Sequence, residues 1–429
     1  MWFVYTVSIW RPALHDVITA QSRVTSADFH TFTMVLIRKW TETRRSSGAR
    51  REEELDLEAA RVVSPTNEKI TPKAVTHRSQ LPRHSLGPKW MSFIDDDTPM
   101  SALTIPGTHD SAAFTRSWPF VTTQRMNIRQ QLKHGIRYLD FRCGVRNDIV
   151  EMVHGPAFLG ISLDNVLQTV YQWLGNHPSE ALVVQIKQDR KESKSKMHFA
   201  QAIFEIISKT SERWRTANTS TTLGELRGRI QLFRRYDGPT LDAYGINVFE
   251  WEDNPMKPFT IYTQHGIQLT IQDHYKFPGP TGLPSLVTKK GGDVCELMDT
   301  AANDPDPHHW YLNFVSAYEF NIYYQLTPYE VAVGGYWNFK WIEGTNVLLR
   351  LYLKEKSGQK RRHGIVAMDY PELATNDLMT ALIRSNFDPD DVSEAALSGH
   401  LVRTLLLLAM ILAGAWILSQ IPNCLLGAP

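Results

Sequence analysis

The sequence predicts an α/β protein built as an irregular (β/α)8 TIM barrel, with a disordered N-terminal extension and a C-terminal hydrophobic helix. Three observations predict the barrel. Eight short apolar runs follow one another along residues 89–387, segments with a helical period separate several of them, and the runs end in polar residues at turns. Near-continuous apolar strands are typical of a parallel sheet covered on both faces, and strands that alternate with helices are typical of a barrel.

The predicted strands are read directly from these apolar runs. The segment CGVRNDI between the second and third runs leaves no room for a helix, so we expect the barrel to depart from regularity there. In chain order, the eight predicted strands are 102–110, 136–144, 148–155, 181–189, 228–237, 267–275, 309–318 and 364–370.

Three helices are predicted from their patterns. The clearest spans Ser162 to Gly175, where apolar residues recur every three or four positions behind a serine N-cap. Residues 196–209 predict a second helix between the fourth and fifth strands, and residues 376–385 a third one after the eighth strand. The first two lie where crossover helices of a barrel belong.

The two ends of the chain differ from the barrel segment. Residues 1–88 are predicted to be largely disordered, because Phe, Trp and Tyr are absent between Thr43 and Pro82 and charged and small polar residues dominate there. The first ten residues are apolar but no basic residue precedes them, which makes a poor secretory signal.

Residues 404–421 carry no charge over 18 positions and follow a linker at 388–403. We expect this segment to be a transmembrane or membrane-anchor helix, because it is apolar on every face whereas a helix at a core surface would be amphipathic. A removable lipid-attachment signal is the less simple alternative, since its polar spacer would be unusually short.

Composition narrows the possible partners. The formal net charge is +1, so no overall field favours nucleic acid, and phosphate chemistry would need a local cluster of cations. The three cysteines are far apart and lack the spacing of a metal site or a disulfide framework.

Polar residues at the ends of the predicted strands form the candidate active site, because the carboxyl ends of barrel strands meet at one mouth. Two histidines with an arginine suit phosphodiester cleavage: one imidazole removes a proton, the other donates one, and the guanidinium holds phosphoryl oxygens. In chain order, these residues are His109, Asp110, Asp140, Arg142, His154, Lys187, Arg235, Asp273, Tyr275 and Asp369.

These blocks occur in the order of a known family. KWMSFIDDDTPMSALTIPGTHDSAAF, IRYLDFRCG and VHGPAFLGISLDNVLQTVYQWLGNHPSEALVVQIKQD resemble the opening blocks of the bacterial-type phosphatidylinositol-specific phospholipases C, relatives of the eukaryotic X domain. The resemblance covers about residues 89–387 and implies metal-independent cleavage of phosphatidylinositol, or a related inositol lipid at a membrane surface, to diacylglycerol and inositol 1,2-cyclic phosphate. It implies no cofactor.

The resemblance also implies roles for individual residues. His109 corresponds to the general base and His154 to the general acid, while Arg142 corresponds to the phosphate-binding cation. Asp110 corresponds to the carboxylate that works with Arg142 and the leaving group, and Asp369 to the one that orients the base.

The remaining matches belong to inositol recognition. They are Lys187, Arg235, Asp273 and Tyr275, with Arg235 preferred to Arg234 because it directly precedes Tyr236. Ser111 invites a serine-hydrolase reading, but the nucleophile implied here is the hydroxyl of the substrate itself.

Two alternatives stay open on the sequence. A metal-dependent glycerophosphodiesterase or sphingomyelinase-D-like phosphodiesterase would use a similar barrel but needs a carboxylate cluster, against which Arg142 argues. A non-catalytic inositol-lipid-binding module would keep the barrel and dispense with turnover, yet both His109 and His154 are present.

Overall fold

The structure, a computed structural model, describes residues 86–238, 244–373, 375 and 377–388. The predicted extension at 1–88 lies almost entirely outside these residues, and so do most of the 388–403 linker and all of the 404–421 segment. In the described part of the chain, no helix is long and apolar enough to cross a membrane.

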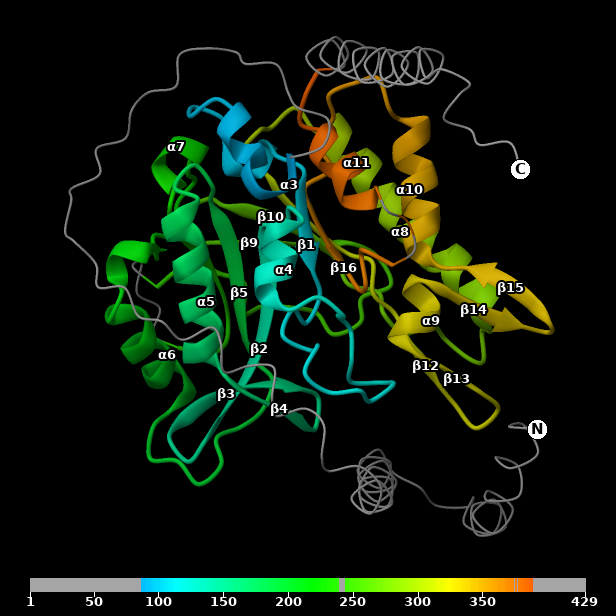
Figure 1. The fold of residues 1–429 in the computed structure, drawn as a ribbon, viewed down its shortest axis with the longest axis horizontal. Helices are drawn as coiled ribbons and strands as arrows, with labels where there is room; N and C mark the ends of the chain where they lie inside the picture. Colours follow the sequence, from blue (N-terminus) through cyan, green and yellow to red (C-terminus); the bar gives the residue numbers. More distant parts are fainter. Residues whose placement is uncertain (1–85, 239–243, 374, 376, 389–429) are drawn as a thin grey trace, which may run out of the picture. The chain divides into compact units, whose positions relative to one another are not determined.

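A curled, mostly parallel sheet forms the centre of the fold (Figure 1). All eight predicted strands are present, and seven of them pair in parallel in the order β7-β5-β2-β1-β16-β11-β10. These seven are β1 (Ile105–Thr108), β2 (Tyr138–Arg146), β5 (Leu182–Gln188), β7 (Ile230–Arg235), β10 (Gln268–Gln272), β11 (Trp310–Phe314) and β16 (Ile365–Met368).

Short strands continue the sheet at both of its ends. β6 (Trp214–Arg215) and β8 (Ile246–Asn247) pair in parallel with β7, and β9 (Phe259–Tyr262) pairs antiparallel with β10. Among the described residues no pairing joins these two ends, so the sheet is an open half-barrel, whereas the sequence predicted an irregular barrel of eight strands.

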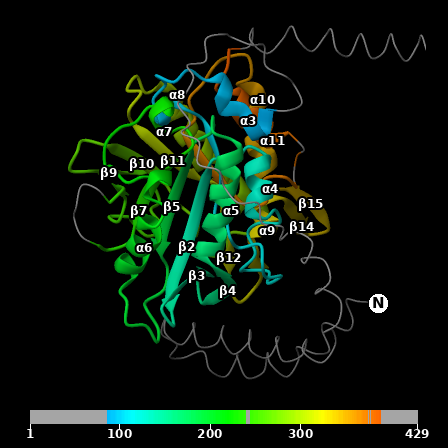
Figure 2. The ribbon, with the colours of Figure 1, turned by 60° about the vertical axis from the view of Figure 1, so that its left-hand side comes forward.

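The third predicted strand is not a barrel strand. β3 (Ile149–His154) runs antiparallel to β2 and then pairs with β4 (Ala157–Ser162), so the two form a hairpin that continues the end of β2 (Figure 2). The physical reason is the tight turn at Asn147 and Asp148, whose φ angles are both positive, at 53° and 61°. Such a turn matches the twist of an antiparallel pair, and it occupies the segment that had no room for a helix.

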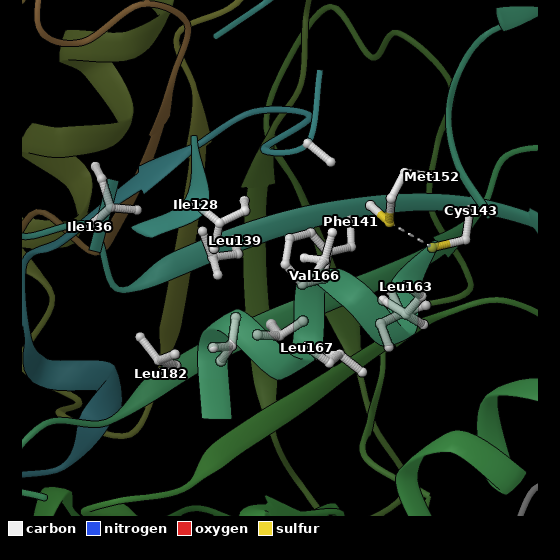
Figure 3. Packing of buried hydrophobic residues seen from close by; sticks show 14 of the residues in the cluster. Ile128, Ile136, Leu139, Phe141, Cys143, Met152, Leu163, Val166, Leu167 and Leu182 are labelled. Atoms are coloured by element: carbon white, nitrogen blue, oxygen red, sulfur yellow. Dashed lines mark hydrogen bonds between the residues drawn. The ribbon is translucent and has the colours of Figure 1, made fainter. Parts of the chain in front are cut away.

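The predicted crossover helix is confirmed as α5 (Leu163–Asn176), and the Ser162 side chain accepts a hydrogen bond from the Asn165 amide as its N-cap. The helix ends one residue later than predicted, and Gly175 lies inside it. Its apolar face packs on β2 through residues such as Val166, Leu167 and Leu163 (Figure 3). This cluster fills the layer between the sheet and the outer helices.

The other two predicted helices are shorter than expected. α6 (Phe199–Ser208) starts three residues late, because residues 195–196 bind the Asp148 carboxylate in a turn and Glu192 accepts the amide of Phe199. α11 (Leu378–Arg384) follows the eighth predicted strand.

The two long helices α8 (Leu283–Asn303) and α10 (Thr345–Glu355) and the two hairpins between β11 and β16 were also not predicted. α8 contains Gly291 and Gly292, which argue against a helix in the sequence. A Cβ at Gly291 would lie 2.9 Å from Leu348 of α10, so the glycine permits close packing of the two helices. The hairpins between β11 and β16 are β12 (Glu319–Phe320) with β13 (Gln325–Leu326), and β14 (Gly334–Trp337) with β15 (Lys340–Glu343).

Short helical segments complete the fold. They are α3 (Leu86–Lys89), η1 (Trp90–Phe93), η2 (Met100–Ala102), α4 (Ile128–Lys133), η3 (Ser211–Arg213), α7 (Leu223–Leu226) and α9 (Pro328–Ala332).

Candidate active site

Strand alternation brings the candidate residues to one place. Successive side chains of a strand point to opposite faces, so each strand carries an interior column of every second residue. On β2 this column reads Tyr138, Asp140, Arg142, because Tyr138 belongs to the interior cluster, whereas Leu139 and Phe141 pack against the helices. The interior columns of the other strands end at Lys187, Arg235, Asp273, Asp369 and His109.

The same alternation separates Arg235 from Arg234. Phe233 belongs to the interior cluster, so Arg235 shares its face, and its guanidinium lies 3.9 Å from the Asp273 carboxylate. Arg234 points to the helix side, where it donates to the carbonyl of Tyr236. The geometry therefore places Arg235 with the other strand-end residues.

The first histidine is held by a buried carboxylate. Nδ1 of His109 lies 2.8 Å from Oδ1 of Asp369, and the two side chains are 12% and 1% exposed. The Asn346 amide of α10 donates to the Asp369 carbonyl, which fixes the turn that follows β16. A carboxylate at Nδ1 leaves Nε2 as the nitrogen that can exchange a proton with a substrate.

The second histidine comes from the β3–β4 hairpin. Nδ1 of His154 lies 2.6 Å from Oδ2 of Asp110, and the His154 side chain is 18% exposed. The two imidazole rings lie edge to face with centroids 6.5 Å apart. Both rings can therefore contact a single phosphodiester group.

A guanidinium lies among the carboxylates of β1 and β2. Nε of Arg142 is 3.2 Å from Asp140 and 3.9 Å from Asp110, both of which are fully buried. Its terminal nitrogens form no hydrogen bond with any residue that the structure describes, so the fork that binds phosphate oxygens is free. Although burial opposes ionisation of Asp140, the charge of Arg142 lowers the pKa of this carboxyl.

Asp140 is the hub that joins β1, β2 and β5. Its carboxylate accepts the Asp110 amide at 3.1 Å and the Gln185 side chain at 2.9 Å, in addition to Arg142. Ser111 is buried beneath this hub, and its hydroxyl accepts the Asp140 amide and donates to the Thr108 carbonyl. Such a buried, fully engaged hydroxyl serves as structure, which agrees with the rejection of Ser111 as a nucleophile.

The opposite side of the mouth combines cations, carboxylates and aromatic rings. Arg235 stacks on the Trp251 ring at 3.5 Å, and the Trp251 indole donates to Asp273 at 2.9 Å. Tyr275 donates its hydroxyl to Asp253 and stacks on Tyr318 with ring centroids 6.1 Å apart. This is a surface on which a polyhydroxylated ring can stack and exchange hydrogen bonds.

Lys187 completes this side. Its ammonium lies 2.5 Å from Oδ1 of Asp189. Burial and the charge of Arg142 lower the pKa of Lys187 in spite of this partner. Burial acts to raise the pKa of Asp189, but Lys187 and Arg142 hold it well below its usual range, so the carboxylate stays ionised.

Sequence reasoning missed Trp251, Gln185 and Asp189. The interior alternation could have found Gln185, which lies between Val183 and Lys187 in the β5 column, and Asp189, which follows Lys187 by two positions. Trp251 lies on an irregular segment after β8, where no periodicity marks it.

A cavity of about 700 Å³ adjoins the Lys187 and Arg235 side of the site. It lies between the ends of β5 and β7 and the start of α6. Its lining residues include Asp189, Arg190, His198, Arg235, Tyr236 and Phe249. The described residues contain no group of three or more His, Cys, Asp or Glu side chains arranged to hold a metal ion.

The fold and the site together define a class of protein. A parallel α/β sheet and an adjoining hairpin bring two histidines, each beside a carboxylate, around an arginine, which is the arrangement of an acid–base enzyme that acts on phosphate esters.

Comparison with known proteins gives the family. The model of the X domain of phosphatidylinositol-specific phospholipase C matches residues 97–236. A 1-phosphatidylinositol phosphodiesterase of Listeria monocytogenes is 31% identical over 304 residues, which cover 67% of this chain and 82% of that protein. One of Staphylococcus aureus is 26% identical over 315 residues, covering 69% and 93%.

The solved structures agree. A mutant of the phosphatidylinositol-specific phospholipase C of Staphylococcus aureus superposes with a TM-score of 0.59 at 26% identity, over 71% of this chain and 99% of that one. The chain therefore belongs to the phosphatidylinositol-specific phospholipase C family.

Proposed function

We propose that this protein is a phosphatidylinositol-specific phospholipase C that cleaves its substrate by metal-independent acid–base catalysis. One observation carries the proposal: His109 and His154, each bound to its own buried carboxylate, lie 6.5 Å apart at the same mouth as the free guanidinium fork of Arg142. This arrangement supplies a base, an acid and an anion clamp without a further group.

The reaction is an intramolecular transfer. His109 takes the proton of the inositol 2-hydroxyl as its oxygen attacks phosphorus, and the bond from phosphorus to the diacylglycerol oxygen breaks as His154 gives that oxygen a proton. The products are diacylglycerol and inositol 1,2-cyclic phosphate, which water then opens slowly. Attack by a neighbouring hydroxyl gains from high effective molarity, so the step needs no activated water.

The carboxylates have distinct roles in this mechanism. Asp369 fixes the tautomer and orientation of His109 and stabilises the imidazolium that forms. Asp110 faces both His154 and Arg142, so it supports the protonated acid and positions the clamp. Arg142 occupies the place among Asp110 and Asp140 where a metal-dependent phosphodiesterase would need a cation, which disfavours that alternative.

The inositol ring binds between Lys187, Arg235, Asp273 and Tyr275. Arg235, held by Trp251 and Asp273, donates to ring hydroxyls, Asp273 accepts from them, and Tyr275 stacks on the apolar face of the ring. The adjoining cavity of about 700 Å³ leaves room for a larger headgroup, and its mixed acidic, basic and aromatic lining suits a sugar on the inositol.

Aromatic hairpins beside the site suit a membrane surface. Tyr323 at the β12–β13 turn and Tyr336 and Phe339 of the β14–β15 hairpin are among the most exposed apolar side chains in the described residues, and Phe339 is fully exposed. Tyr324 and Trp337 join the two hairpins with ring centroids 4.8 Å apart. Tyrosine and tryptophan favour the membrane–water interface, so these hairpins would bind the membrane surface and orient the opening of the active site toward it.

The 404–421 segment would then keep the enzyme at the membrane as a single-pass anchor. Its apolar length meets the lower limit for a span. Fractionation of the full chain with carbonate extraction and protease protection tests this point, and release of the protein by carbonate would contradict it.

The central experiment follows the products by phosphorus NMR. The purified protein with phosphatidylinositol in excess EDTA should form the cyclic phosphate first, and His109→Ala and His154→Ala should each abolish most of that turnover. Absence of cyclic phosphate would refute the activity, full dependence on added calcium would refute the metal-free mechanism, and wild-type turnover by both variants would refute the assigned roles.

A further inference from the structure

Asp189 joins three parts of the site. Its Oδ1 lies 2.5 Å from the Lys187 ammonium, its Oδ2 accepts the Gly155 amide at 3.2 Å, and its own amide donates to the Cys143 carbonyl of β2 at 2.9 Å. Its side chain is only 13% exposed. The end of β5 is thereby connected to β2 and to the turn that carries His154.

That turn needs such support. His154 lies on a hairpin outside the parallel sheet, and the residue after it, Gly155, has a φ of +49° with nothing within 4 Å of the position of a Cβ. The β3–β4 pairing also shifts register between Glu151 and Val153, so regular strand pairing holds this end less firmly than it holds β2 or β5.

Residue 190 reinforces the contact. The Arg190 guanidinium donates to the Pro156 carbonyl and lies over the Phe158 ring at 5.0 Å. Residues 189 and 190 therefore hold the His154 turn at two points, because Asp189 accepts the Gly155 amide and Arg190 donates to the Pro156 carbonyl.

We propose that Asp189 is a positioning residue with two separable effects, an inference that rests on the proposed function. Its oxygen facing Gly155 holds the His154 turn so that the imidazole reaches the leaving oxygen. Its charge facing Lys187 holds that ammonium in the inositol site. The low pKa of Asp189 is consistent with a charge that is present throughout the neutral range.

Two substrates with different leaving groups distinguish a loss of proton donation to the leaving group from a general loss of activity. Short-chain phosphatidylinositol releases an alkoxide-like oxygen that needs a proton, whereas the 4-nitrophenyl ester of inositol 1-phosphate releases a phenolate that needs none. Asp189→Ala should lower kcat on the lipid by about 10- to 100-fold and on the aryl ester by less than about threefold. His154→Ala should show the same preference more strongly.

Two further variants complete the design. Asp189→Asn keeps an acceptor for Gly155 but loses the charge for Lys187, so it should keep the wild-type ratio of kcat values and raise KM for both substrates. Glu192→Gln is the matched control, because that carboxylate lies on the same loop and accepts the Phe199 amide at the start of α6. It should change neither the ratio nor KM.

The outcomes are distinguishable. If Asp189→Ala lowers turnover of both substrates by the same factor, or leaves the lipid rate unchanged, Asp189 does not act through the acid. If Asp189→Asn changes the ratio of the two kcat values, or leaves KM at the wild-type value, the assignment of separate roles to the two carboxylate oxygens is wrong. Failure of the wild-type protein to form cyclic phosphate from either substrate would instead refute the proposed function.

Discussion

Arg142 offers the sharpest test of the phosphate clamp. Arg142→Lys keeps a cation beside Asp110 and Asp140, which are fully buried and would be left uncompensated by a neutral residue, so the variant should fold. An ammonium cannot reproduce the two parallel N–H bonds of a guanidinium fork. One lost bond to a charged phosphoryl oxygen costs about 1.5 to 3 kcal/mol, and poorer alignment of the remaining one adds to this.

We therefore expect kcat/KM of Arg142→Lys to fall by about 100-fold, which corresponds to about 3 kcal/mol of transition-state stabilisation. The assay is cyclic phosphate release from short-chain phosphatidylinositol. Arg146→Lys is the control on the same strand, because Arg146 is 39% exposed, binds Glu151 and lies over the Phe158 ring, away from the carboxylates of the clamp. It should stay within about threefold of wild type. Equal losses in both variants, or a loss below threefold in Arg142→Lys, would refute the clamp.

Three more predictions concern stability, headgroup binding and the membrane. Burial lowers the pKa of His363 from 6.5 to about 4. The neutral, buried imidazole is therefore fully compatible with the fold above pH 6.5, and the free energy of unfolding declines by about 3 kcal/mol as the pH falls to 4. His363→Gln should flatten this pH dependence, as measured by urea unfolding. Trp251→Leu should raise KM about tenfold with little change in kcat, and an unchanged KM would contradict its support of the inositol site. Tyr336→Ser should weaken vesicle binding about threefold or more, whereas Tyr262→Ser should not, since Tyr262 is a similarly exposed tyrosine at the end of β9, paired with the amino end of β10.

The strands and crossover helix α5 were predictable because their signals are local. A parallel strand between two apolar layers must be apolar on both faces. The helix α5 is marked in the sequence by its serine N-cap and by apolar residues every three or four positions. Three of the site residues follow from the same rule, because alternation along the predicted strands places His109, Arg142 and Asp369 on the interior face of the sheet.

What the sequence left hidden depends on contacts between distant segments. The antiparallel direction of β3 depends on the positive φ angles of Asn147 and Asp148. In the sequence alone, the same two residues are equally compatible with a longer loop. In the sequence, Gly291 of α8 argues against a helix. The structure explains the glycine, because a Cβ at this position would lie 2.9 Å from Leu348 of α10. Trp251 acquires its position only through Arg235 and Asp273, which lie 16 residues before and 22 after it.

Asp110 shows how the site departs from the alternation that builds it. His109 ends the interior column of β1, so the next side chain would point to the helix side in a continued strand. At Asp110 the backbone instead turns to a φ of +39°, and its carboxylate reaches His154 and Arg142 at the mouth. A non-glycine residue in this region costs about 1 kcal/mol or more, and aspartate tolerates it better than most residues.

The surrounding hydrogen bonds hold this conformation in place. The Asp110 amide donates to Asp140, its carbonyl accepts the Thr123 hydroxyl, and the Gln124 side chain donates to the His109 carbonyl. The pair His109 and Asp110 can thus face one substrate from adjacent positions only because the backbone leaves the extended conformation at Asp110. The backbone strain at Asp110 is therefore what allows the proposed base and the partner of the proposed acid to come from consecutive residues.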